Sequence, residues 1–444
     1  MSDHGRNEGN RRMPVRLTLF VMMALEFFIW GAWLPLIFGY LPSLGFNPLE
    51  QSLILSAFPV ASIVGMFFSN QWADRSGSPE RVLAASHLIG GLAILGCGFT
   101  RSFWPFFVLM LVHCLFYVPT ISITNSIAFA NLRNGRDFGL VRMGGTVGWI
   151  LAAWPFTFVF VNWAAVEAAQ PQGFVAWLGT ALGNPLTGDA AKAAASWTFV
   201  VAGAASLALA AFSLVLPRSS AAAPTSSGAT RTAWAEAFAL LRHPFFLVLW
   251  LVTLADSFVH NAYFNWTGVF LGTAREAGGV GIASNWITPV MSIGQVMEIL
   301  TMLVLGATLK RLGWRTTMVV GILGHAARFL VYAFFPASAA TIIAVQMLHG
   351  ICYAFFFATV YIFVDAYSAK DIRASAQGLF NLQILGIGAL LANVICPWLM
   401  QSVYTTGGVT DFKSLFMVPL AVATLAAIAL ALFFRPPDAR PAAA

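Results

Sequence analysis

The sequence is poor in charge. Asp, Glu, Lys and Arg make up 9% of its 444 residues, whereas hydrophobic residues make up 59%. A soluble domain carries about 25% charged residues, so this composition excludes an ordinary soluble globular protein. The mean hydropathy of +0.78 and the long apolar runs instead indicate a protein that crosses a membrane several times.

Cysteine and the familiar catalytic motifs are also scarce. The four cysteines lie inside apolar runs without metal-type spacing, which favours buried small side chains over a metal site. The chain lacks His-Glu-x-x-His, Gly-x-Ser-x-Gly and the phosphate-binding Gly-x-x-x-x-Gly-Lys-[Ser/Thr]. We therefore expect neither an enzyme nor an ATP-driven pump, and we expect no metal or other cofactor.

The apolar residues gather into twelve segments, each long enough to form a helix that crosses a bilayer, which needs roughly 20 residues. They lie at 17–41, 52–72, 82–100, 103–132, 141–163 and 197–216, and again at 245–271, 284–309, 316–335, 339–367, 374–401 and 415–434. A stretch rich in Ser, Ala, Thr and Pro separates the two sets of six. We expect an all-α membrane protein with six-helix bundles at 1–216 and 244–444, joined by a cytoplasmic linker at 217–243.

The basic residues predict the orientation. Most Lys and Arg residues fall on one side of the membrane when the amino terminus is cytoplasmic, and the positive-inside rule then places both termini there. This asymmetry accounts for the net charge of +7, so we expect lipid around the chain and no nucleic acid partner. We expect a monomeric, multi-pass protein of a bacterial inner membrane, with a short helix in the long outer loop 162–196.

The eighth segment contains two polar residues that are unusual for a bilayer. Gln295 and Glu298 interrupt the apolar stretch 286–305, and their i, i+3 spacing places them on one face of a helix. A carboxylate at mid-membrane costs about 2.5–3.5 kcal/mol, so such a residue faces a polar cavity or a partner. The pattern fits either a Glu bonded to a neighbouring helix or a midplane site for a solute or proton, and we favour the second.

Other predicted spans also carry polar or aromatic residues at membrane depth. They are Glu26 and Trp30 in the first, Asn125 in the fourth, Arg142 and Thr146 in the fifth, Asp256, His260 and Asn261 in the seventh, and Tyr353 in the tenth. Each alone is compatible with a hydrogen bond between helices. Together they suit a polar solute that carries a ring, although this chemistry does not separate a sugar from a nucleoside. Asp365 and Arg373 flank the cytoplasmic end of the tenth segment, where we expect gate or loop contacts.

Two short loops occupy corresponding places in the two halves. Residues 70–77 read NQWADRSG and residues 306–313 read GATLKRLG, each with a basic residue two positions before a Gly. The first resembles the G-x-x-x-D-[RK]-x-G-[RK] loop of the major facilitator superfamily, with Asn in place of the first Gly. The resemblance implies that Asp74 bonds across the interface between the halves, that Arg75 and Arg81 complete a charge network, and that the bundles rock about a midplane site.

From about residue 25 to residue 434 the chain is similar to the nucleoside:proton symporter family of that superfamily. The matching stretches are Trp30-Gly-Ala-Trp33, Pro119-Thr120 with Asn125, Arg142-x-x-Gly-Thr146-Val-Gly148, Ser292-x-x-Gln295-x-x-Glu298, Ala327-Arg328-Phe329 and Ile372-Arg-Ala-Ser-Ala-Gln-Gly378. The resemblance implies the major facilitator fold and a nucleoside site lined by four of these residues, Arg142, Thr146, Gln295 and Glu298. Further expected contacts are His260, Asn261, Trp30, Asn125 and Tyr353.

Two positions depart from the family pattern. Ala354 stands where the family usually has an acidic residue, and Glu26 stands where Gln is common. A proton symporter needs a cavity group that changes protonation during its cycle, and burial favours the protonated form of a carboxylate. The remaining candidates are Glu298, Glu26 and Asp256, of which we favour Glu298 because it adjoins the proposed solute ligand. His260 is the alternative, because an imidazole titrates near pH 6.5.

We therefore expect a secondary transporter that imports nucleosides together with protons by alternating access. One alternative is a facilitator or symporter for another hydroxylated solute such as a sugar. Two others are a membrane-embedded enzyme, against which the missing motifs argue, and a non-transporting receptor, against which the short tails argue.

Overall fold

The computed structural model describes residues 14–76, 78–132, 135–217, 237–368 and 373–436, with backbone only at 65–76, 129, 135–139 and 373–375. Within these ranges the chain is almost entirely helical. Helices satisfy every interior backbone N–H and C=O along a single segment, which is the requirement that a bilayer imposes on a spanning chain.

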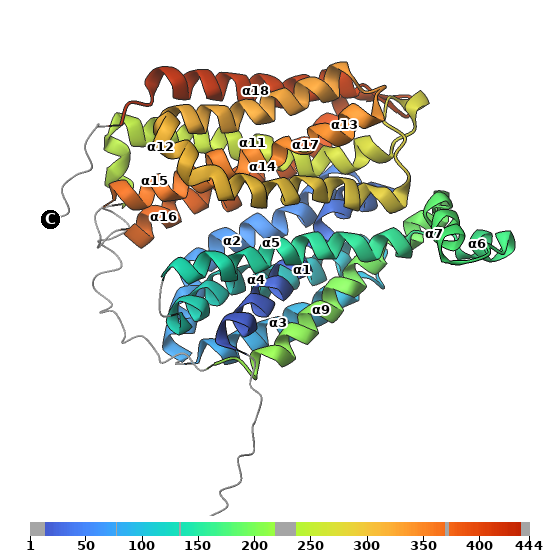
Figure 1. Ribbon diagram of the computed structural model, residues 1–444, viewed down its shortest axis with the longest axis horizontal. Helices are drawn as coiled ribbons and strands as arrows, with labels where there is room; N and C mark the ends of the chain where they lie inside the picture. The colour runs from blue at the N-terminus through green and yellow to red at the C-terminus, as the bar shows by residue number, and fades with distance from the viewer. Residues whose placement is uncertain (1–13, 77, 133–134, 218–236, 369–372, 437–444) are drawn as a thin grey trace, which may run out of the picture.

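In the first half, six long helices and three short ones lie within the described residues. The long ones are α1 (Val15–Ser43), α2 (Pro48–Ser76), α3 (Pro79–Cys97), α4 (Phe103–Asn131), α5 (Gly135–Val159) and α9 (Trp197–Ser213), and the short ones are α6 (Trp163–Ala169), α7 (Phe174–Gly183) and α8 (Gly188–Ala195). The long helices occupy the lower part of Figure 1, where α6 and α7 project at the right-hand end. The outer loop thus contains three short helices where one was expected.

The second half occupies the upper part of Figure 1. Its α-helices are α11 (Pro244–Gly272), α12 (Ile287–Phe334), α13 (Ala339–Val345), α14 (Leu348–Cys352), α15 (Thr359–Tyr367), α16 (Arg373–Asn381), α17 (Gly388–Trp398) and α18 (Phe412–Phe433). Three π-helical turns, η4 (Tyr353–Ala358), η5 (Leu382–Ile387) and η6 (Leu399–Val403), continue the helices before them. The 3-10 turns η1 (Leu240–Arg242), η2 (Arg275–Ala277) and η3 (Ser284–Trp286) and the strands β1 (Thr405–Thr406) and β2 (Val409–Thr410) lie in connections.

Helix α12 contains two of the predicted spans. Its 48 residues form two successive helices, one for each span, because the backbone leaves the helical conformation at one residue between them. Gly313, with a φ of 72°, interrupts the helical conformation between the two parts. This left-handed position favours glycine because it has no Cβ atom.

Nine helical stretches within the described residues, some of them made of several consecutive helices, are long and apolar enough to cross a membrane. One of them is the double span 284–334, and α2 contributes a shorter apolar stretch, Pro48–Val64. All twelve predicted segments contain helix. An all-α membrane protein is therefore confirmed.

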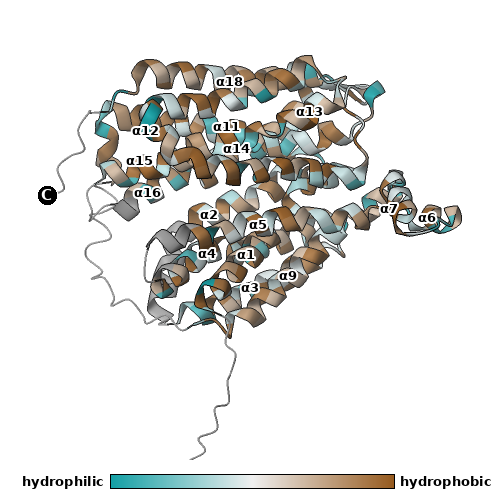
Figure 2. Ribbon diagram, viewed as in Figure 1, coloured by the Kyte–Doolittle hydropathy of each residue, from teal (hydrophilic) through white to brown (hydrophobic). Residues whose placement is uncertain are grey.

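The surface is apolar in the way that lipid requires. Large hydrophobic side chains are exposed on several helices, among them Leu303 at 74% and Leu425 at 66%. Figure 2 shows hydrophobic residues along α18 and α9, at the outside of the molecule. In water such extended apolar surfaces would promote association, whereas in a bilayer they face lipid tails.

Candidate functional site

Gln295 and Glu298 lie on the face of α12 that points into the protein. Gln295 is 7% exposed, whereas its neighbours Val296 and Leu300 are 44% and 50% exposed. Glu298 is half-buried. Gly350 in α14 lets the backbone of that helix approach the backbone of Glu298, because a Cβ atom at position 350 would collide with it. The two polar residues therefore lie inside the protein while the opposite face of α12 is free to contact lipid.

Arg142 faces this carboxylate from the other half of the molecule. Helices α5 and α12 pack against each other, and Arg142 lies within electrostatic range of Glu298, Tyr353 and Tyr361. The guanidinium carbon lies 4.0 Å from the centre of the Phe27 ring, a cation–π contact that fixes its position. The structure thus brings together Arg142, Glu298 and Tyr353 from two halves of the chain.

A series of aromatic rings crosses from one half to the other near these polar groups. Trp30 stacks on Phe58 at 4.7 Å and meets Trp149 edge-on at 5.3 Å. Trp149 in turn contacts Phe264 across the interface at 6.2 Å, and Phe264 contacts His260 at 5.3 Å. Flat apolar faces beside charged and amide groups suit a solute with a polar ring.

The other predicted contacts are more scattered. Asn261 donates to the backbone oxygen of Ser257 at 2.8 Å, a bond within its own helix. Asn125 is partly buried, and its Oδ1 has no hydrogen-bond partner among the described residues. Thr146 is partly buried on α5, one turn from Arg142. We retain these residues as predicted contacts.

Two of the predicted proton carriers lie inside the separate halves. Glu26 bonds His87 between α1 and α3 at 2.9 Å, and Asp256 bonds His325 between α11 and α12 at 2.8 Å. Neither histidine was predicted from the sequence, because which residues meet across packed helices depends on the rotation of each helix. Of the three carboxylates, Glu298 is the one beside the interface residues Arg142 and Tyr353.

The predicted gate residues are only partly described. Arg81, near the start of α3, and Asp365, in α15, are exposed. The side chains of Asp74, Arg75 and Arg373 lie outside the described residues, so the charge network stays a prediction.

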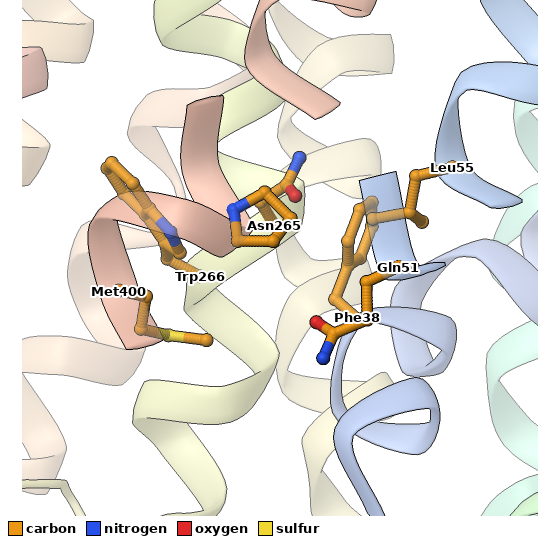
Figure 3. Close-up of a pocket in the computed structure, with 7 residues that line it drawn as sticks. Phe38, Gln51, Leu55, Asn265, Trp266 and Met400 are labelled. Atoms are coloured by element: carbon orange, nitrogen blue, oxygen red, sulfur yellow. The ribbon is translucent and has the colours of Figure 1, made fainter. Parts of the chain in front are cut away.

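Hydrogen bonds join the halves at the end that the predicted topology places outside. They are the reciprocal amide bonds of Gln51 and Gln401 at 2.7 and 3.2 Å, Asn393 to the Leu55 oxygen at 2.7 Å, and Ser52 to the Val394 oxygen at 3.3 Å. A small hollow adjoins this contact, with Phe38, Gln51 and Leu55 on one side and Trp266 and Met400 on the other, as Figure 3 shows. Asn265 lies between the two groups and donates to Asn393 at 3.0 Å.

The outer loop reinforces this closure. Ser284 donates to the backbone oxygen of Leu186 at 2.7 Å, and Asn285 donates to that of Leu182 at 3.3 Å. Both donors lie in η3, immediately before the helix that carries Gln295. The loop of the first half therefore fastens the start of α12.

Known proteins resemble the chain over nearly its whole length. A family model described as nucleoside H+ symporter matches residues 13–187 and 173–439. The putative nucleoside transporter YegT of Escherichia coli (strain K12) is 28% identical over 439 residues, 96% of this chain and 95% of that protein. The nucleoside permease NupG of the same organism is 24% identical over 95% of this chain and 96% of its own, and the xanthosine permease is 25% identical over 91% and 92%.

Solved structures agree on the fold. A crystal structure of nucleoside transporter NupG superposes with a TM-score of 0.76 at 22% identity, covering 96% of this chain and all of that one. A D-xylose-proton symporter gives 0.64 at 14% identity over 95% and 98%. These likenesses confirm the predicted major facilitator fold. Together with the match to the family model over both halves, they identify a transporter and not an enzyme: the chain belongs to the nucleoside H+ symporter family.

Proposed function

We propose that the protein imports nucleosides together with protons, and that the solute binds between α5 and α12. The observation that carries this proposal is the packing of α5 on α12, which places Arg142 and Glu298, one from each half, within electrostatic range of each other beside the aromatic series. Two charged groups of opposite sign, one from each half, can bind a polar solute between the halves. When the halves rock, this site becomes accessible from one side of the membrane and then from the other.

The proposed contact residues bind different parts of the nucleoside. Gln295 and Asn261 offer amide donors and acceptors to the sugar hydroxyls or the base edge, and Trp30 and Tyr353 offer ring faces to the base. Arg142 and Thr146 bond polar groups from the α5 side. Asn125 and His260 complete the list of proposed contacts.

Glu298 is the proposed link between solute and proton. It is half-buried, adjoins Gln295 and is influenced by the charge of Arg142, so protonation of Glu298 changes the electrostatics at the solute position. Glu26, which is fully buried and bonded to His87 and Thr120, is less suited to exchange with solute.

We further propose that residues 1–216 and 244–444 move as two units joined by the linker 217–243. On this proposal the protein is a monomer in a bacterial inner membrane, and both of its termini are cytoplasmic. The inner gate is formed by Asp74, Arg75, Arg81, Asp365 and Arg373. The outer gate includes the amide contacts of Gln51 and Gln401.

Counterflow in proteoliposomes tests the substrate class. Vesicles preloaded with unlabelled uridine should take up labelled uridine, and external nucleosides should compete while D-xylose and D-glucose should not. Competition by the sugars but not by nucleosides would replace the proposal with the sugar alternative.

A further inference from the structure

Each half of the chain contains a fully buried carboxylate–histidine pair at a corresponding position. Glu26 bonds His87 between the first and third long helices of the first half. Asp256 bonds His325 between α11 and the second part of α12, which are the first and third spans of the second half. All four side chains are 0% exposed.

Each half also has a second histidine near this pair, and the two second histidines occupy corresponding positions. In the first half, His113 bonds the backbone oxygen of Gly90 at 2.9 Å; in the second, His349 bonds Nη1 of Arg328 at 3.1 Å. Gly90 and Arg328 each lie three residues after the paired histidine of their half. Aromatic rings seven residues after each carboxylate face these histidines, at 6.1 Å for Trp33–His113 and 4.9 Å for Tyr263–His349. Both halves therefore build their buried polar cluster on one plan.

The carboxylate–histidine pair of the first half is fully bonded, whereas the Nε2 of the neighbouring His113 has no hydrogen-bond partner among the described residues. The second oxygen of Glu26 accepts from Thr120 at 2.7 Å, and the second nitrogen of His87 lies 3.0 Å from the hydroxyl of Ser206. The carboxylate and the paired imidazole thus have a partner on every polar atom. Such a network fixes helices together, because breaking it leaves buried polar atoms unsatisfied.

The carboxylate–histidine pair of the second half is not fully bonded. Asp256 Oδ2 and His260 Nδ1 are buried, and neither has a hydrogen-bond partner within the described part of the chain; His325 Nε2 has no well-formed hydrogen bond, and only the weakly bonding thiol of Cys352 lies beside the His325 ring. An unsatisfied buried polar atom costs about 1–3 kcal/mol, so it needs an explanation. A proton or a water molecule that comes and goes explains why bonding capacity is left open in this carboxylate–histidine pair and closed in the equivalent pair of the first half.

Of the histidines His325 and His349, His325 is the one whose ring can accept a further proton. The guanidinium of Arg328 can only donate, so the bonded Nδ1 of His349 is an acceptor and that ring is neutral. Cys352 faces His325 from α14. His260 is partly exposed, and its ring lies 5.7 Å from that of His325 and 6.3 Å from that of Tyr353. It connects the buried pair to the proposed solute site.

We propose that Asp256 and His325 form a second proton-binding site, separate from Glu298 and reached through His260. In this step a hydronium ion at the interface gives up a proton and becomes water, the proton passes by way of His260 to His325 Nε2, and the Nδ1–H of His325 keeps its bond to Asp256. The product is an imidazolium paired with a carboxylate, and the new N–H bond breaks when the proton returns to water on the other side. The inference rests on the proton coupling proposed above.

The test compares equivalent residues of the two halves in proteoliposomes. Asp256→Asn and His325→Gln should retain uridine counterflow, which requires no net proton movement, and should lose at least fivefold of the uridine accumulation driven by an inward proton gradient. Glu26→Gln and His87→Gln should lower thermal stability while the folded protein retains wild-type accumulation. Wild-type accumulation by Asp256→Asn would overturn the inference, whereas absence of counterflow in the wild type would overturn the proposed function.

A measurement on the unmodified protein covers the case in which the variants do not fold. Spectra of protein labelled with 15N-histidine distinguish the two pairs, because His325 bonds its carboxylate through Nδ1 and His87 through Nε2. The proposal expects a histidine with a carboxylate-bonded Nδ1–H to change from neutral to imidazolium as pH falls. A ring of this type that keeps one protonation state over the pH range of transport would contradict it.

Discussion

At the scale of single residues, the glycines of α5 explain why this helix lies so close to α1. A Cβ atom at Gly148 would collide with the backbone of Ala24, and one at Gly144 would collide with the backbone of Phe20. Because Arg142 and Thr146 lie on the same part of α5, this close approach also positions the proposed site.

The fit at Gly148 predicts a stability difference. Gly148→Ala should lower the melting temperature in detergent, since overpacking costs about 1–3 kcal/mol and exceeds the gain in helix propensity. Gly179→Ala in α7 is the matched control, because nothing lies within 4 Å of a Cβ atom there. A melting temperature that is equal to or higher than that of the wild type for Gly148→Ala would contradict the account of the packing.

The predicted solute contact of Gln295 can be tested by binding. Gln295→Ala should weaken uridine binding about tenfold or more, because losing a partner for a buried polar group costs about 1–3 kcal/mol and 1.4 kcal/mol corresponds to a factor of ten. Val296→Ala, on the exposed face of the same helix, should leave the affinity unchanged. Isothermal titration calorimetry measures both, and wild-type affinity in Gln295→Ala would remove this residue from the site.

Arg142 offers a test that separates charge from geometry. Lys retains the positive charge but lacks the planar fork of donors that bonds two acceptors at once. Arg142→Lys should therefore reduce uridine uptake at least tenfold. Normal uptake by this variant would show that the residue serves as a charged anchor and not as a solute ligand.

At the scale of helices, the contact between the halves at the predicted outer end depends on neutral amides. The side chains of Gln51 and Gln401 each donate to the other, and Asn393 links the same face of α2 to Asn265 of α11. Uncharged hydrogen bonds contribute about 0.5–1.5 kcal/mol each, which suits a contact that must form and break in every cycle.

Loss of the hydrogen bonds between Gln51 and Gln401 should separate the two halves at their predicted outer end more often. In a protein with a reporter cysteine at Leu55→Cys, which lines the hollow of Figure 3, Gln401→Ala should increase labelling by an external membrane-impermeant maleimide several-fold. Ser402→Ala, at an exposed neighbour, serves as the control. Equal labelling of the two variants would argue against a role of the pair in closure.

The helices themselves were predictable, because each spanning segment needs an apolar run of suitable length. The partners of Glu26 and Asp256 were not, since residues far apart in sequence meet only once the rotation and depth of each helix are set. The π-helical turn at Tyr353 was also missed, because a single extra residue in a turn leaves no mark in an apolar sequence.

At the scale of the whole molecule, the two-part arrangement follows from the break in hydropathy between 216 and 244. The fold was therefore predictable. The proximity of Arg142 and Glu298 was not, because it requires knowing which helices of the two halves face each other. The motifs of the fifth and eighth segments identified the residues, and the structure brought them to the same interface.

The most direct test of proton-coupled nucleoside import is uridine accumulation in proteoliposomes under an inward proton gradient. Wild-type protein should concentrate uridine severalfold above the external level. Glu298→Gln, which resembles the protonated acid, should bind uridine and exchange it but should not concentrate it. Wild-type vesicles that equilibrate uridine without concentrating it, or Glu298→Gln vesicles that concentrate it like the wild type, would contradict coupling through Glu298.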